Sequence, residues 1–221
     1  MPLFELDPTD PGAPFPDPTL ALTEPDGLLA VGGDLSPQRL LNAYHQGIFP
    51  WYAEGQPILW WSPDPRTVLT PESLHVSRRL ARTLRRSKFT VTYDTDFSGV
   101  LEGCAAPRDD QDGTWLLPEM KDAYLRLHRL GYAHSVECWL DGELAGGLYG
   151  VRLGRVLFGE SMFTRITDAS KVALVHALRD PAFGPIDLLD CQMTTDHLLR
   201  MGAQEIPRHE FLHQLEELTS A

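Results

Sequence analysis

The segment AHSVECWLDGELAGGLYGVRLGRVLFGESMF, residues 133–163, decides which fold we expect for this chain. Residues 134–140 are expected to form a strand. Asp141 and Gly142 are typical of a hairpin turn, and residues 144–151 and 156–163 continue as strands. The segment therefore predicts three consecutive strands in a largely antiparallel hairpin region.

Helices and further strands are expected on both sides of this region. On its C-terminal side, Asp168 is expected to cap a helix that runs to Leu178. The remaining expected elements are helices at 36–46, 74–87, 96–105, 118–130, 195–201 and 208–219, and strands at 89–93 and 186–191. This order predicts an α+β fold with a mixed, largely antiparallel sheet.

Proline sets the start of the chain apart. Twelve of the 18 prolines lie before residue 66. Proline lacks a backbone donor and breaks helices, so this part should be rich in loops. We expect a small proline-rich N-terminal domain at residues 1–64 and a larger domain at residues 65–221.

Composition excludes several classes of protein. With 221 residues and 43% hydrophobic side chains the chain can bury a sizeable core. It has no apolar run of 18 residues, and its acidic start does not resemble a signal peptide. Its three cysteines form no CxxC pair, as is usual for reduced proteins. We therefore expect a cytoplasmic protein with no membrane contact. Composition does not give the oligomeric state, and we expect a monomer.

Charge is distributed unevenly. The net charge of −12 disfavours a nucleic-acid partner, yet six of the nineteen basic residues lie within residues 78–88. Arginine outnumbers lysine sixteen to three, and its planar fork suits phosphate. A charged helix face usually only meets water, but like charges four residues apart repel each other. The cluster therefore favours contact with a nucleic acid.

Two strand segments place carboxylates among apolar neighbours. Alternation predicts that Glu160 and Met162 share one strand face and that Ser161 lies on the other. The same rule places Asp190 and Gln192 together at a strand end, where they could orient and deprotonate an amine. A salt bridge at Glu160 and a helix cap at Asp190 are the simpler alternatives.

The sequence contains no complete motif for binding a metal or a nucleotide cofactor. His209 and His213 have metal-ligand spacing, but no third ligand is signalled nearby. Neither a GxGxxG nor a GxxxxGK[ST] motif occurs, so the glycines at 146–154 favour a packed hairpin or a ligand lying against the sheet. No metal and no organic cofactor is expected.

Short motifs in a fixed order carry a family resemblance along most of the chain. They are EPDGLLAVGGDL (24–35), AY (43–44), GIFPW (47–51), LWWSPDPR (59–66), GTW (113–115), AHSVE (133–137), GGLYG (146–150), GESMF (159–163), ASK (169–171), DCQ (190–192) and GA (202–203). On these motifs the chain resembles the leucyl/phenylalanyl-tRNA–protein transferases.

The resemblance implies an aminoacyltransferase. Such an enzyme moves leucine, phenylalanine and, less well, methionine from aminoacyl-tRNA to proteins with N-terminal arginine or lysine, which are then marked for degradation. It also implies a C-terminal domain like the GNAT acetyltransferases, with aminoacyl-tRNA in place of acetyl-CoA. The donor is an activated ester, and an α-amine with a pKa of about 8 is partly uncharged at neutral pH.

The resemblance also implies roles for particular residues. Asp190, Gln192 and Glu160 would handle the acceptor amine and its proton. The terminal adenosine of the tRNA would stack on Trp51 and Trp115. The donor side chain would lie against Leu148, Leu157, Met162, Leu174 and Leu189. The acceptor stem would contact Arg78, Arg82, Arg85 and Arg86.

Some positions depart from the family pattern, and two other functions stay open. Thr195 and Asp168 stand where asparagine is expected, while Leu157 and Ala177 stand where some members have aromatic residues, which leaves the donor preference open. A GNAT-type N-acetyltransferase would need a pyrophosphate loop that the sequence lacks. A non-catalytic tRNA-binding protein would need the arginine helix but not Asp190.

Overall fold

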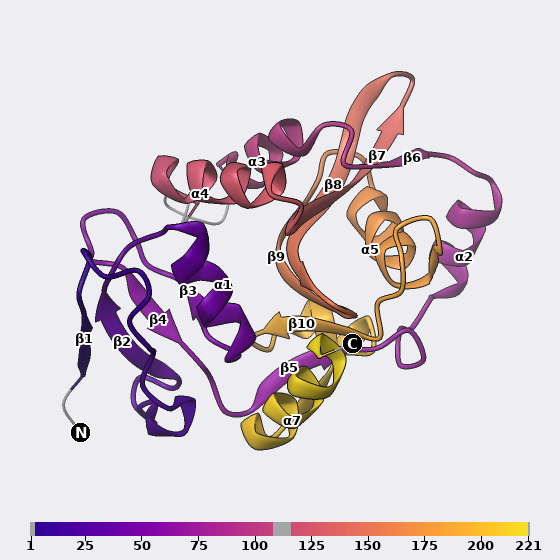
Figure 1. The fold of residues 1–221 in the computed structure, drawn as a ribbon. Coiled ribbons are helices and arrows are strands. Elements are labelled where there is room, and N and C mark those ends of the chain that lie inside the picture. The colour runs from indigo at the N-terminus through magenta and orange to yellow at the C-terminus, as the bar shows by residue number, and fades with distance from the viewer. Residues whose placement is uncertain (1–2, 108–115, 221) are drawn as a thin grey trace.

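Two β-sheets organise the computed structural model, which describes residues 3–107 and 116–220 (Figure 1). Within those residues the first sheet has four strands in the order β1-β2-β4-β3, with only β1 and β2 parallel. Its strands are β1 (Phe4–Leu6), β2 (Leu28–Gly32), β3 (Phe49–Pro50) and β4 (Leu59–Trp61). A 3-10 helix, Pro18–Leu20, precedes β2.

The second sheet carries the hairpin region. Across the described residues it has seven strands in the order β11-β5-β10-β9-β8-β7-β6. These are β5 (Arg66–Leu69), β6 (Thr90–Tyr93), β7 (Ala133–Leu140), β8 (Glu143–Leu153), β9 (Val156–Thr164), β10 (Leu188–Gln192) and β11 (Gln204–Ile206). Only β9 and β10 pair in parallel, so the predicted α+β class and the mixed, largely antiparallel sheet are confirmed.

Helices cover both faces of the second sheet. The α-helices are α1 (Pro37–His45), α2 (Arg78–Arg85), α3 (Phe97–Ala105), α4 (Pro118–Arg129), α5 (Ala169–Arg179), α6 (Asp196–Arg200) and α7 (Arg208–Thr219). Helix α5, with α2 packed on it, lies on one face, and α3 and α4 lie on the other. Helices α1 and α7 complete the second layer, and α1 also contacts β3 of the first sheet. None of the helices described is both long and apolar enough to cross a bilayer.

Local sequence explains where most helices begin. The Ser36 hydroxyl accepts the N–H of Arg39, and Pro37 occupies the first turn of α1. Ser77 caps α2 in the same way, so that helix starts four residues later than predicted. Asp168 occupies the N-cap position of α5 as predicted, but its carboxylate makes no capping hydrogen bond, because its backbone is left-handed (φ 75°) and the carboxylate contacts Thr83 and Arg79 of α2 instead.

One hydrophobic core joins the two sheets. The same cluster contains Leu6 and Trp60 from the N-terminal part, and Phe158 and Leu215 from the rest of the chain. A second cluster lies between the large sheet and α5. The change from one sheet to the other falls between Trp61 and Arg66, but the core does not divide there. The division into domains 1–64 and 65–221 stays a prediction.

Candidate functional site

A cavity of about 910 Å³ opens where β9 and β10 separate. The parallel pairing of these strands ends at Phe158 and Asp190, while β9 continues to Thr164. Beyond that point β9 is paired only with β8 in the described part of the sheet. The cavity follows this gap, and its walls come from β9, the end of β10, α5, α6, the end of α3 and the segment at Phe49.

Glu160 enters the site through a β-bulge. Tyr149 pairs with Ser161 and Gly150 pairs with Gly159, so Glu160 is an extra residue opposite β8. The bulge reverses the alternation, and Met162 packs in the cluster against α5, whereas Glu160 points to α1 and α4. The prediction that Glu160 and Met162 share a face is therefore wrong.

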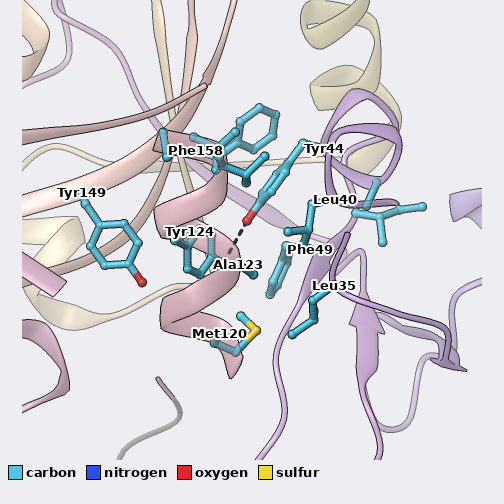
Figure 2. Packing of buried hydrophobic residues seen from close by; sticks show 14 of the residues in the cluster. Leu35, Leu40, Tyr44, Phe49, Met120, Ala123, Tyr124, Tyr149 and Phe158 are labelled. Carbon is cyan, nitrogen blue, oxygen red and sulfur yellow. Dashed lines mark hydrogen bonds between the residues drawn. The ribbon is translucent and has the colours of Figure 1, made fainter. Parts of the chain in front are cut away.

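Three side chains hold the Glu160 carboxylate. Oε1 accepts the Tyr44 hydroxyl at 2.8 Å and the Gln192 amide at 3.0 Å, and Oε2 accepts the Tyr124 hydroxyl at 2.5 Å. The two tyrosine hydroxyls are 3.0 Å apart, and Figure 2 shows them meeting between α1 and α4. A carboxylate fixed by three donors has little freedom to rotate, which suits a group that must meet a substrate atom.

Burial raises the pKa of Glu160 to about 7, and the nearby charge of Asp190 adds to the increase. Hydrogen bonds from Tyr124, Tyr44 and Gln192 act in the opposite direction, because they stabilise the charged form. Burial also raises the pKa of Tyr44 and Tyr124 well above the usual value, so both hydroxyls stay protonated. Glu160 can thus exchange a proton near neutral pH.

Asp190 lies beneath the cavity, in a buried ion pair. Arg66 donates from Nε to Oδ1 at 2.8 Å and from Nη2 to Oδ2 at 2.7 Å, and both side chains are fully buried. Cys191 is an extra residue opposite β5, and this second bulge interrupts the alternation that placed Asp190 beside Gln192. The Asp190 side chain faces Arg66, whereas Gln192 lines the cavity and binds Glu160.

The apolar wall contains most of the residues expected for the donor side chain. Those that line the cavity are Leu148, Met162, Leu174 and Leu189. Leu157 is not among the lining residues; it lies fully buried in the core behind them, and Ala177 is also outside the lining. The departures at these two positions therefore do not alter the wall directly.

Trp51 stands at the edge of the cavity with 39% of its surface exposed. Its ring meets Trp61 edge to face at 5.7 Å, and Trp61 Nε1 donates to the Trp51 carbonyl. An exposed indole held in this way can stack on a base. Trp115, the other expected adenosine contact, lies outside the described residues.

The expected arginine surface lies on α2, away from the carboxylates. Arg78, Arg82, Arg85 and Arg86 are all exposed. Leu80 anchors the helix in the cluster that also contains α5, so α2 and the cavity wall from α5 share one packing layer. Helix α2 therefore presents these arginines to solvent while it packs on α5.

Sequence reasoning missed the partners of the carboxylates. Tyr44 and Tyr124 lie 116 and 36 residues from Glu160, and Arg66 lies 124 residues from Asp190. The rule that a buried charge needs a partner signals that such groups exist, but not which they are. In the described part of the chain, no group of three histidine, cysteine, aspartate or glutamate side chains gathers as metal ligands.

Comparison with solved structures gives distant likenesses. A GCN5-related N-acetyltransferase from Kribbella flavida is 14% identical, with 76% of this chain and 60% of that chain covered and a TM-score of 0.36. A functionally unknown conserved protein from Staphylococcus epidermidis ATCC 12228 is 10% identical, with 81% and 68% covered and a TM-score of 0.44. The fold class rests on the strand order itself.

Comparison of sequences is decisive. The family model "Leucyl/phenylalanyl-tRNA protein transferase" matches residues 68–216, and that of its N-terminal domain matches residues 33–64. A leucyl/phenylalanyl-tRNA--protein transferase of Azoarcus sp. (strain BH72) is 60% identical over 93% of this chain and 87% of its own length. One from Anaeromyxobacter sp. (strain Fw109-5) is 63% identical over 91% and 85%. The chain belongs to the leucyl/phenylalanyl-tRNA–protein transferase family.

Proposed function

We propose that this chain transfers leucine or phenylalanine from aminoacyl-tRNA to the N-terminus of an acceptor protein. The observation that carries the proposal is the position of Glu160, a carboxylate with a pKa of about 7 in the wall of a cavity that is otherwise largely apolar. The family relatives bear the name of this activity. The apolar wall suits an uncharged donor side chain, and Glu160 suits an amine.

The proposed reaction is attack by the acceptor α-amine on the carbonyl carbon of the aminoacyl ester. A carbon–nitrogen bond forms and the bond to the ribose oxygen breaks. Glu160 accepts the proton that leaves the amine, and this proton passes on to the released ribose oxygen, which becomes a hydroxyl. Holding both substrates in one cavity supplies much of the rate enhancement.

This proposal gives Asp190 a different part from the one that the sequence suggested. Arg66 engages both of its oxygens, and Asp190 is fully buried and does not line the cavity, whereas Glu160 does. We therefore assign proton transfer to Glu160, with Gln192 as its cavity-side partner. The buried negative charge of Asp190 contributes by raising the pKa of Glu160.

Finer features of the substrate belong to the same proposal. Methionine is also expected as a donor, because its unbranched side chain fits an apolar wall. The family resemblance makes it the weaker donor. The acceptor begins with arginine or lysine, and its modification marks the protein for degradation in the cytoplasm. The enzyme acts as a monomer, with Trp51 and Trp115 on the terminal adenosine and the α2 arginines on the acceptor stem.

A transfer assay tests the function. The protein is incubated with leucyl-tRNA and a peptide that begins with arginine, and mass spectrometry follows the addition of one leucine residue. A peptide with an acetylated N-terminus is the matched control and should stay unmodified. Acetylation by acetyl-CoA, or tRNA binding without transfer, would favour an N-acetyltransferase or a tRNA-binding protein instead.

A further inference from the structure

Arg66 is a buried arginine that no part of the proposed reaction uses directly. Its side chain is fully buried at the start of β5. The guanidinium lies over the ring of Phe49 at 5.0 Å and over that of Phe211 at 4.6 Å. Two parallel N–H groups fix it to Asp190, and among the described residues Nη1 has no hydrogen-bond partner. The planar fork cannot move without carrying Asp190 with it.

Asp190 passes this constraint to Gln192. Arg66 donates one hydrogen bond to each oxygen of the Asp190 carboxylate. The Oδ1 atom also accepts the backbone N–H of Gln192 at 2.9 Å. The backbone of Gln192 has φ of 62°, a conformation that few residues other than glycine adopt. Cys191 forms the bulge between the two residues. The carboxylate thus stabilises the bulge that turns Gln192 towards the cavity.

Gln192 then reaches the reacting carboxylate. Its amide donates to Oε1 of Glu160, the same oxygen that the Tyr44 hydroxyl binds. An unbroken series of hydrogen bonds therefore runs from Arg66 through Asp190 and Gln192 to Glu160. Its members come from β5, β10 and β9, which are adjacent strands of the large sheet.

We propose that Arg66 is a positioning residue for the transfer reaction, which sets through Asp190 the bulge at Cys191 and hence the orientation of Gln192 against Glu160. The inference rests on the proposed function, and it goes further by giving the buried ion pair a role in the reaction. A purely structural pair would stabilise the fold and leave the cavity side of Glu160 unchanged.

The first test replaces Arg66 by lysine, which keeps the charge but loses the fork. We expect kcat to fall roughly 10²-fold with KM for leucyl-tRNA unchanged, because the reacting group is misplaced while binding surfaces remain. The acidic limb of the pH–rate profile should move to higher pH, since Glu160 loses a bond that stabilises its charged form. Gln192→Leu should give the same shift, and combining both changes should add little.

Arg39→Lys is the matched control. Arg39 is also fully buried and paired with an aspartate, and it lies over Phe15, but its bonds go to Asp34 and to N-terminal carbonyls. This variant should keep the wild-type pH profile. If Arg66→Lys behaves like Arg39→Lys in kcat and pH profile, Arg66 has only a structural role and the proposal is wrong.

Two further measurements keep the proposal open to refutation. If Arg66→Lys does not fold, Arg66→Met with Asp190→Leu removes both charges together, a change that buried pairs often tolerate. That double variant should fold and bind tRNA without transferring, and normal transfer by it would overturn the proposal. Carbon-13 NMR titration of Glu160 in Arg66→Lys should show a raised pKa; an unmoved pKa would refute positioning even if the wild type proves inactive in transfer.

Discussion

At the scale of single residues, the site depends on one carboxyl group in an unusual place. Glu160 is the extra residue of a bulge, and the donors that surround it come from α1, α4 and β10. In a regular strand, Glu160 would lie on the same face of the sheet as Met162. The bulge places an ionisable group against the cavity, where burial raises its pKa to about 7.

Glu160→Gln should remove the step in activity near pH 7. Transfer by the wild type should rise as pH passes through about 7, because Glu160 accepts a proton only once ionised. A second rise from the acceptor amine, at about pH 8, should remain in the variant. A raised folded-state pKa means that ionising Glu160 opposes folding, so the variant should be more stable than wild type above pH 7. An unchanged limb near pH 7 in Glu160→Gln would assign the proton to another group.

Trp51→Ala should weaken binding of aminoacyl-tRNA. Losing one base stack costs about 1–3 kcal/mol, which is roughly 5- to 150-fold in Kd. Trp51→Phe should recover part of the loss because it keeps an aromatic face. Filter binding of leucyl-tRNA measures both variants, and an unaltered Kd in Trp51→Ala would separate this indole from the adenosine.

At the scale of elements, the sequence correctly predicted the helices and strands whose positions depend on local sequence pattern. The hairpin strands β7, β8 and β9 and helices α1, α3 and α4 lie within a few residues of their expected positions. Strand β5, which contains Arg66, was missed because it is short and flanked by prolines, and its pairing partner β10 lies far along the chain. The sequence also predicted Glu160 and Gln192 as site residues, and both line the cavity. The bulges that orient them depend on the register between strands, which no local pattern specifies.

Helix α2 should bind tRNA through its exposed arginines. Arg82→Ala with Arg86→Ala should weaken binding of every tRNA alike and reduce the slope of log affinity against log salt by about 1 per lost phosphate contact. Lys121→Ala with Arg129→Ala removes the same charge from α4 and should leave the slope unchanged. Equal slopes for the two double variants would make α2 an ordinary solvated surface.

Helix α5 should tune the choice of donor through Leu174. Leu174 lines the cavity, whereas its neighbour Val175 is buried outside the lining. Leu174→Ala should raise the rate with phenylalanyl-tRNA relative to leucyl-tRNA, by a factor that corresponds to about 1–3 kcal/mol per methylene group of space. Val175→Ala is the matched control and should leave the ratio unchanged. A ratio unmoved by Leu174→Ala would place the donor side chain elsewhere.

At the scale of the whole molecule, the two sheets depend on each other. Phe49, which packs on Arg66, and Tyr44, which binds Glu160, both come from the N-terminal part. The hydrophobic cluster that contains them continues into the layer of α3 and α4. The contacts of Glu160 and Arg66 and the core packing therefore extend across the boundary that the prolines suggest.

Residues 65–221 expressed alone should not fold to a stable enzyme. The truncation exposes apolar side chains such as Phe158 and leaves Glu160 without its Tyr44 donor. Circular dichroism melting should give one cooperative transition for the full chain and none for the fragment. A fragment with a sharp melting transition would show that the two parts are independent folding units.

The hydrogen bond from Tyr44 to Glu160 also has a consequence for how the enzyme meets its substrates. Tyr44 is fully buried, so its hydroxyl holds the Glu160 carboxylate in place from the N-terminal part of the chain. In kinetic terms, we expect a single encounter step rather than an encounter followed by domain closure. No fraction of the molecules then needs to rearrange to become competent, and the affinity for aminoacyl-tRNA is not reduced by such a fraction.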